Sequence, residues 1–492
     1  MVLKGETRIN KYTDLNKQFV GGQWRTGTGE SGIEVLNPYT QQKVTSIQAA
    51  SQKDIDEAYE TAKAAQKEWA EVNAFEKSRI MEKAVRIMEE RREELIQVLI
   101  EDAGSTRIKA NVEVDFTLAI TRHSASFPMR MEGTMPPSII PGKENHVYRK
   151  PLGVVGVIGP FNFPMYLAMR SVAPAIATGN AVVLKPDSQT PLSGGTLLGK
   201  IFEEAGVPAG IMNVVVPKIS EVGDGFVEHP VPRMISFTGS TGVGRHIGEI
   251  TGRMIKKTVL ELGGNNPLVV LDDADIPLAI QGAAFGKFMH SGQICMAVNR
   301  IIVHKDVYDE FTKGFIELAK GLKSGDPEKE DTLIGPLINQ DSVQRILGEV
   351  EKAKEEGAEV LLEGKVDGNV MTPFVLKGTN EVSTAKHEMF GPVVTIIPVD
   401  SEEEALRVAN DTEYGLSGAV HAGTDSKAMA FAKKMETGMV HINDQSVNDE
   451  PLVAFGGEKS SGIGRFGGDW SLDEFTTFQW ISVQNTSREY PF

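Results

Sequence analysis

Cysteine is almost absent from this chain, since Cys295 is the only thiol in 492 residues. A single thiol excludes a disulfide framework within the chain. Long apolar runs are absent as well, because no uncharged run that is apolar throughout approaches the roughly 18–20 residues that span a bilayer. Residues 1–6 lack the apolar core of a secretory signal. These absences predict a cytoplasmic protein with no membrane partner.

Positive charge is in deficit, with 51 Lys and Arg against 67 Asp and Glu, which gives a net charge of −16. A nucleic-acid surface needs a basic stripe, and none is present, so nucleic acid is not expected as a partner. No cluster of His, Cys and Asp has the spacing of metal ligands, so no catalytic metal is expected. The length exceeds that of one hydrophobic core and predicts two or three domains.

The patterning of the chain predicts an α/β protein. A capping box at 51–54 opens a helix, and apolar residues at helical spacing predict a second helix over 76–101. The Pro-rich segment 135–142 predicts a linker or an arm. From residue 153 onward, short β-branched runs alternate with helical stretches, which indicates a largely parallel sheet. A second α/β block begins near residue 266.

Two segments carry candidate catalytic side chains. Cys295 follows Gly292 in a tight turn, and the carboxylate of Glu261 stands beside the Gly263–Gly264 pair. A nucleophile and a possible base on separate Gly-rich turns indicate covalent catalysis. His290 offers an alternative Cys–His pair, but the base of such a pair is normally remote in sequence, and we interpret His290 as structural.

Four further positions each have a functional and a structural interpretation. The turn from Gly239 to Gly244, between a strand and a helix, is either a phosphate cradle or a helix cap. Asn162, flanked by prolines, either donates to an oxyanion or stabilises a turn. Lys185 ends a strand where cofactors bind in open sheets, or is a surface lysine. Glu388 either holds a ribose or belongs to a turn.

Taken in order, these segments resemble the aldehyde dehydrogenase superfamily over nearly the whole chain. Residues 292–295 and 260–264 match its two signatures. The local sequence around Asn265 and Met296 is similar to that of benzaldehyde and vanillin dehydrogenases. The resemblance implies two Rossmann-like parallel-sheet domains and a small β oligomerisation arm.

The domain bounds follow from the same resemblance. It implies a cofactor-binding domain over 1–128 and 152–263, a catalytic domain over 264–471, and an arm formed by 129–151 and 472–492. The tail, residues 475–492, alternates like an edge strand that pairs with another element or with a subunit, and the exposed strand edge of the arm is expected to pair across a subunit interface. A homodimer or a homotetramer is therefore expected.

The mechanism is also an implication of the resemblance. The Cys295 thiolate attacks an aldehyde, Asn162 and the Cys295 N–H stabilise the oxyanion, and hydride passes to NAD or NADP. Glu261 then activates the water that hydrolyses the thioester, and its apolar neighbours favour a raised pKa. Family members often carry a lysine nine residues after the Asn, but Ser171 stands there, after Arg170. A proton relay through that lysine is therefore not expected.

The resemblance also assigns ligand contacts. Lys185 is expected on the adenosine ribose, Gly239 and Ser240 on the pyrophosphate, Glu388 on the nicotinamide ribose and Phe390 near the nicotinamide. Many NAD-preferring members have a Glu where this chain has Ser188, so we expect NADP to be accepted as well as NAD, with Asp187 partly restoring the preference. The expected lining of an apolar tunnel for aromatic or medium-chain aldehydes, with core packing as the alternative, is Phe163, Leu167, Met289, Ile294, Met296 and Phe455.

Three rival functions stay open at this point. A dehydrogenase that passes its thioester to coenzyme A is disfavoured by Glu261, and a non-catalytic protein is disfavoured by the joint presence of Cys295, Glu261 and Asn162. A cysteine hydrolase is the third. An aliphatic aldehyde or a semialdehyde is the alternative substrate.

Overall fold

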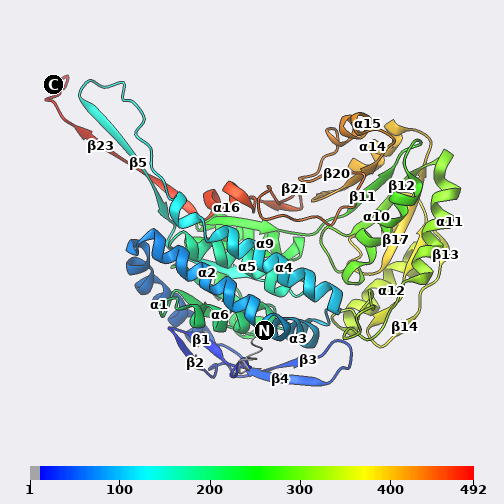
Figure 1. Ribbon diagram of the computed structural model, residues 1–492, viewed down its shortest axis with the longest axis horizontal. Coiled ribbons are helices and arrows are strands. Elements are labelled where there is room, and N and C mark those ends of the chain that lie inside the picture. Colours follow the sequence, from blue (N-terminus) through cyan, green and yellow to red (C-terminus); the bar gives the residue numbers. More distant parts are fainter. Residues whose placement is uncertain (1–10) are drawn as a thin grey trace, which may run out of the picture.

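The computed structural model describes residues 11–492 and has two sheet-centred bodies with a projecting arm (Figure 1). Residues 1–10, which include the segment judged to lack a secretory signal, lie outside the described residues. Both bodies are α/β and built on mostly parallel sheets, so the predicted fold class is confirmed. No helix within residues 11–492 combines the length and apolarity needed to cross a membrane.

The first body is an eight-stranded sheet in the order β2-β1-β8-β7-β6-β9-β10-β22. The five strands from β8 to β10 are parallel, and the edges are antiparallel. The order reverses between β6 and β9, and at such a point the carboxyl ends of the strands flank a crevice. The strands are β1 (Gln18–Val20), β2 (Gln23–Arg25), β6 (Val154–Ile158), β7 (Ala181–Lys185), β8 (Met212–Val214), β9 (Met234–Thr238), β10 (Lys257–Glu261) and β22 (Gly462–Ile463).

Helices cover this sheet, and their starts follow local sequence signals only in part. The capping box is present at the start of the first helix, where Ser51 and Asp54 bond each other's backbone N–H. The single helix predicted over 76–101 is wrong, because the helix is interrupted at Arg91 and two helices take its place. Six successive charged residues, 89–94, interrupt the apolar stripe there. The helices are α1 (Gln52–Glu71), α2 (Ala74–Glu90), α3 (Arg92–Ala103), α4 (Arg107–Ser124), α5 (Pro164–Ala177), α6 (Leu197–Ala205) and α9 (Thr241–Arg253).

The second body holds a seven-stranded sheet in the order β13-β16-β17-β12-β11-β19-β20, parallel except at the β13 edge. Separate apolar clusters lie on its two faces. Its strands are β11 (Asn266–Val270), β12 (Val298–His304), β13 (Glu359–Leu362), β16 (Phe374–Lys377), β17 (Val393–Val399), β19 (Ala419–His421) and β20 (His441–Ile442). Its main helices are α10 (Ile276–Phe288), α11 (Lys305–Gly321), α12 (Gln340–Glu355), α14 (Glu402–Asn410) and α15 (Asp425–Ala432).

The arm is a two-stranded ribbon that extends away from the first body (Figure 1). Strand β5 (Lys143–Pro151) pairs antiparallel with β23 (Thr476–Gln484), so the predicted tail strand is present and its partner is the segment after the Pro-rich run. Large apolar side chains on the ribbon are exposed, among them Phe478 (58 %) and Trp480 (65 %). A ribbon this apolar and this exposed is typical of an interaction surface.

Candidate active site

The predicted site residues lie where the two sheets face each other. Asn162 follows β6, Glu261 ends β10, Cys295 precedes β12 and Glu388 precedes β17. The carboxyl edge of the first sheet thus meets the amino edge of the second. Asn162 Nδ2 donates across this boundary to the backbone oxygen of Gln293 (2.9 Å), and the Gly264 N–H donates to Glu388 Oε1 (3.0 Å).

The turn before Cys295 has an unusual backbone. His290, Ser291 and Gly292 all have positive φ, at 49°, 56° and 75°. At Gly292 a Cβ would stand 2.3 Å from the backbone oxygen of Gly391, so glycine is required there by space as well as by conformation. Two strained non-glycine residues beside the predicted nucleophile are typical of a functional turn.

Cys295 follows this turn by three residues and is half-buried. Its backbone oxygen accepts from Asn266 Nδ2 at 2.8 Å, which fixes the residue against the start of β11. Burial raises the pKa of the Cys295 thiol to about 12, although the positive charge of Arg170 opposes this rise. The sulfur is therefore a thiol at neutral pH in the free protein, and attack on a substrate needs a group that takes its proton.

Glu261 is buried at 2 % exposure, and neither carboxylate oxygen has a hydrogen-bond partner among residues 11–492. Burial raises the pKa of Glu261 to about 8, while the charges of Arg170 and Arg465 oppose the rise. A buried carboxyl group without partners is costly, so native structures retain such groups mainly where chemistry needs them. A pKa near 8 suits a general base at physiological pH.

Asn162 is also buried, and its bond to the Gln293 oxygen uses one of the two N–H groups of its amide. The second N–H is left for another acceptor. Because Gln293 is two residues before Cys295, the amide is held beside the turn that carries the sulfur. This geometry suits an oxyanion donor.

His290 packs edge-on against Phe163, with ring centroids 5.6 Å apart. Burial holds the pKa of His290 well below its usual range, so the ring is neutral. The ring therefore belongs to the packing of the turn, in line with the structural interpretation.

The first residues predicted for the cofactor stand at the carboxyl ends of β7 and β9. Ser240 precedes α9 but forms no side-chain cap within the described chain, so first-turn N–H groups are free to bind an anion. Gly244 allows α9 to pack closely against the side chain of Leu262, because a Cβ at this position would stand 2.2 Å from that side chain. Lys185 ends β7, and burial lowers its pKa against the charge of Asp187. These donors fit the pyrophosphate and ribose of a dinucleotide.

Glu388 and Phe390 approach from the second body. Phe390 has a φ of 49° and meets the ring of Phe161 edge-on at 5.7 Å. Burial raises the pKa of Glu388 to about 7, against its bond from Gly264 N–H. Ser188, three residues after Lys185, is exposed and carries no charge.

The side chains predicted for the apolar tunnel share one environment. All are less than 9 % exposed and fall in a single apolar cluster against which Cys295 packs. Three of them come from the segment around Cys295 in the second body, yet they join the cluster of the first. The members are Phe163, Leu167, Met289, Ile294, Met296 and Phe455.

The sequence interpretation missed one buried polar group beside this cluster. Arg170 donates to Asp449 Oδ2 (3.1 Å), which also accepts from the Tyr166 hydroxyl (2.6 Å). The Arg170 guanidinium lies 4.1 Å from the Phe455 ring centroid. Arg170 is the only charged residue in α5, and that signal was available in the sequence. Nothing in the sequence marks Asp449.

Ser171 occupies the position at which family members often carry a lysine. The Ser171 hydroxyl forms a 2.8 Å hydrogen bond with the Ser236 hydroxyl in the sheet core. Ser171 is thus directed into the packing between α5 and β9.

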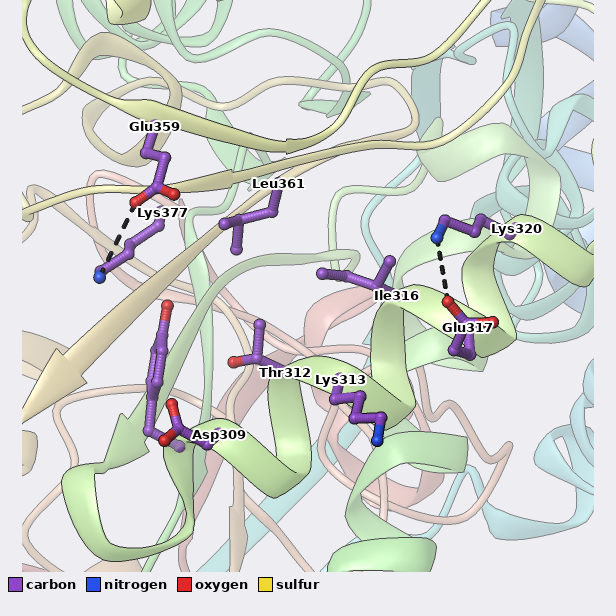
Figure 2. A pocket seen from close by; sticks show the side chains of 10 residues that line it. Asp309, Thr312, Lys313, Ile316, Glu317, Lys320, Glu359, Leu361 and Lys377 are labelled. Atoms are coloured by element: carbon purple, nitrogen blue, oxygen red, sulfur yellow. Dashed lines mark hydrogen bonds and ion pairs between the residues drawn. The ribbon is translucent and has the colours of Figure 1, made fainter.

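A surface pocket of about 490 Å³ lies elsewhere, between α11, the edge strand β13 and its neighbour β16. Its lining includes none of the predicted site residues. Figure 2 shows its two ion pairs, Glu359 with Lys377 and Glu317 with Lys320, and the apolar Ile316 and Leu361 between them. This pocket is therefore separate from the predicted site residues.

Comparison with known proteins agrees with this geometry. The model of the aldehyde dehydrogenase family matches residues 24–481. The chain belongs to the aldehyde dehydrogenase family. A benzaldehyde dehydrogenase of Bacillus subtilis is 53 % identical over 483 residues, which are 98 % of this chain and 100 % of that protein. A vanillin dehydrogenase of Corynebacterium glutamicum is 50 % identical over 96 % of this chain and 98 % of its own.

Solved structures of other aldehyde dehydrogenases have the same fold. An NAD-dependent benzaldehyde dehydrogenase from Corynebacterium glutamicum superposes with a TM-score of 0.89 at 47 % identity, over 96 % of this chain and 99 % of that one. A salicylaldehyde dehydrogenase from Pseudomonas putida, complexed with salicylaldehyde, has a TM-score of 0.94 at 33 % identity, over 97 % and 99 %. The resemblance noted in the sequence is confirmed.

Proposed function

We propose that this aldehyde dehydrogenase oxidises aromatic aldehydes to carboxylic acids with a nicotinamide dinucleotide as hydride acceptor. The observation that carries the proposal is the unpartnered, buried carboxyl of Glu261 near the lone thiol of Cys295. The names of the relatives, which act on benzaldehyde, vanillin and salicylaldehyde, support the aromatic substrate class.

In the proposed mechanism each residue has one task. Cys295 passes its proton to solvent water and attacks the aldehyde carbon, while the free N–H of Asn162 and the Cys295 backbone N–H stabilise the oxyanion. The bound dinucleotide supplies the acceptor for the hydride. The resulting thioester on Cys295 is hydrolysed by water that Glu261 deprotonates. The positive charge of Arg170 lowers the pKa of both Cys295 and Glu261 and so favours their reactive forms.

For the cofactor, we propose that the enzyme accepts both NAD and NADP. Ser188 leaves no carboxylate against a 2′-phosphate, and the Asp187 carboxylate is engaged by the Gln189 N–H (2.9 Å). Comparing kcat/KM for the two cofactors tests this, and strong exclusion of NADP contradicts it. Replacing Ser188 by Glu is expected to shift the ratio toward NAD.

For the assembly, we propose a homodimer or homotetramer held by the arm. The exposed apolar side chains of β23 support this proposal. The division into a cofactor-binding domain (1–128 and 152–263), a catalytic domain (264–471) and an arm (129–151 and 472–492) is part of the same proposal. So is a cytoplasmic location, which suits a chain with one free thiol.

One experiment tests the central proposal. An aldehyde panel is assayed for reduced cofactor with NAD and NADP separately, without coenzyme A. We expect benzaldehyde-type substrates to be turned over faster than short aliphatic ones, with release of free acid, and a Cys295→Ala variant to be inactive. Full activity of that variant contradicts the mechanism. Faster aliphatic turnover contradicts the substrate class, and a need for coenzyme A contradicts the hydrolytic step.

A further inference from the structure

A buried ion pair lies beneath the loop that carries Asn162. Lys109 and Glu113 are one turn apart on α4 and both are fully buried, at 0 % exposure. Lys109 Nζ donates to Glu113 and to Ser105 Oγ (2.9 Å). Removing two charges from water offsets most of their attraction, so a buried pair contributes little net stability. Its presence here calls for a structural purpose.

Glu113 has a second set of partners on α5. Its other oxygen, Oε1, accepts from the backbone N–H groups of Met165 (2.9 Å) and Tyr166 (3.2 Å). These are N–H groups of the first turn, which have no partner within their own helix. Phe163 at the cap position has no side-chain oxygen to offer them. Glu113 therefore caps α5 from another helix, with its negative charge at the positive end of the helix dipole.

The residue between this cap and Asn162 is clamped as well. The Lys109 ammonium lies 4.3 Å from the Phe163 ring centroid, and His290 meets the same ring edge-on at 5.6 Å. The start of α5, the Phe163 ring and the turn before Cys295 are thus joined through the ion pair. Asn162 lies directly before this fixed point and bonds the turn through Gln293.

We propose that Glu113 is a positioning residue for the oxyanion site. Its carboxylate, itself oriented by Lys109, fixes the first turn of α5 so that the free N–H of Asn162 is directed at the substrate oxygen on Cys295. The proposal rests on the proposed function, in which Asn162 stabilises that oxyanion. A displacement of about 1 Å in such a donor is enough to slow a reaction by roughly 100-fold.

Two double variants distinguish the capping of α5 by Glu113 from the charges of Glu113 and Lys109. Lys109→Met with Glu113→Leu removes both charges and the cap, whereas Lys109→Met with Glu113→Gln removes the charges but leaves an amide oxygen for the two N–H groups. Each pair is made in the full-length enzyme with Asn162 and with Asn162→Ala. The pre-steady-state rate of reduced-cofactor formation with benzaldehyde reports acylation of Cys295, and thermal melting checks folding.

We expect the Leu pair to slow acylation by about 10- to 100-fold with little change in the KM for NAD, and the Gln pair to stay within about threefold of the parent. In the Asn162→Ala background the Leu and Gln pairs are expected to be equal within about twofold, because the donor that the cap positions is gone. An equal loss in both backgrounds, or no loss from the Leu pair, overturns the proposal.

Two further results keep the outcomes distinct. If Asn162→Ala alone leaves acylation unchanged, the proposed role of Asn162 fails, whatever the cap does. If the Leu pair does not fold, Glu113→Asp takes its place, because it keeps the charge beside Lys109 but withdraws the carboxylate from Met165 and Tyr166 by one methylene. Acylation by that variant at the parent rate then contradicts the positioning role.

Discussion

Two buried glutamates, Glu261 in the crevice and Glu113 beneath α5, have similar burial and opposite surroundings. Glu113 takes hydrogen bonds from Lys109 and from two backbone N–H groups, whereas Glu261 has no partner among the described residues. Burial raises the pKa of both groups, and at Glu113 the charge of Lys109 opposes the rise. A buried carboxylate with hydrogen-bond partners indicates a structural role, whereas a buried carboxyl group without partners indicates a catalytic role.

The largest expected effect is on turnover when Glu261 is replaced. Glu261→Gln keeps the shape but cannot take a proton, so steady-state turnover is expected to fall roughly 10²- to 10⁴-fold. Acylation does not need the base that activates water, so stopped-flow mixing is expected to show a burst of one reduced cofactor per site. Loss of the burst as well contradicts the division of labour between Glu261 and Cys295.

The stability of the fold is expected to depend on Glu113 and not on Glu261. Glu113→Leu alone leaves Lys109 buried without its counter-charge, and the free energy of unfolding is expected to fall by about 3–5 kcal/mol. Glu261→Gln removes a carboxyl that has no bonds to lose and is expected to leave stability unchanged or raised. Chemical denaturation of both variants measures the difference, and equal destabilisation removes the distinction between the two sites.

The smallest effect is the pH dependence of the hydrolytic step. Glu261 acts as a base only when ionised, and its pKa is about 8. The rate of thioester hydrolysis is therefore expected to rise with pH, by about tenfold per unit below 8, and to level off above it. Glu261→Gln is the control, since its residual rate is expected to lose this rise. A flat profile between pH 6 and 8 in the parent enzyme contradicts a base with this pKa.

The sequence alone was enough for the fold class, while the roles of the candidate site residues were implied by the family resemblance and stay predictions. Alternating β-branched and helical stretches predict a sheet in each body, and motifs at strand ends must meet at sheet edges. The capping box at Ser51 follows from four neighbouring residues. These features depend on local spacing, and local spacing is what a sequence displays directly.

Contacts between distant segments were decided only by the tertiary structure. Arg170 meets Asp449 across 279 positions, and Glu113 caps the turn of Met165 across 52. The side chain of Arg91 likewise bonds Glu204 at 3.0 Å. Such pairings arise from how whole helices and sheets pack, because the energy of a buried charge depends on what surrounds it in space and not on its neighbours along the chain.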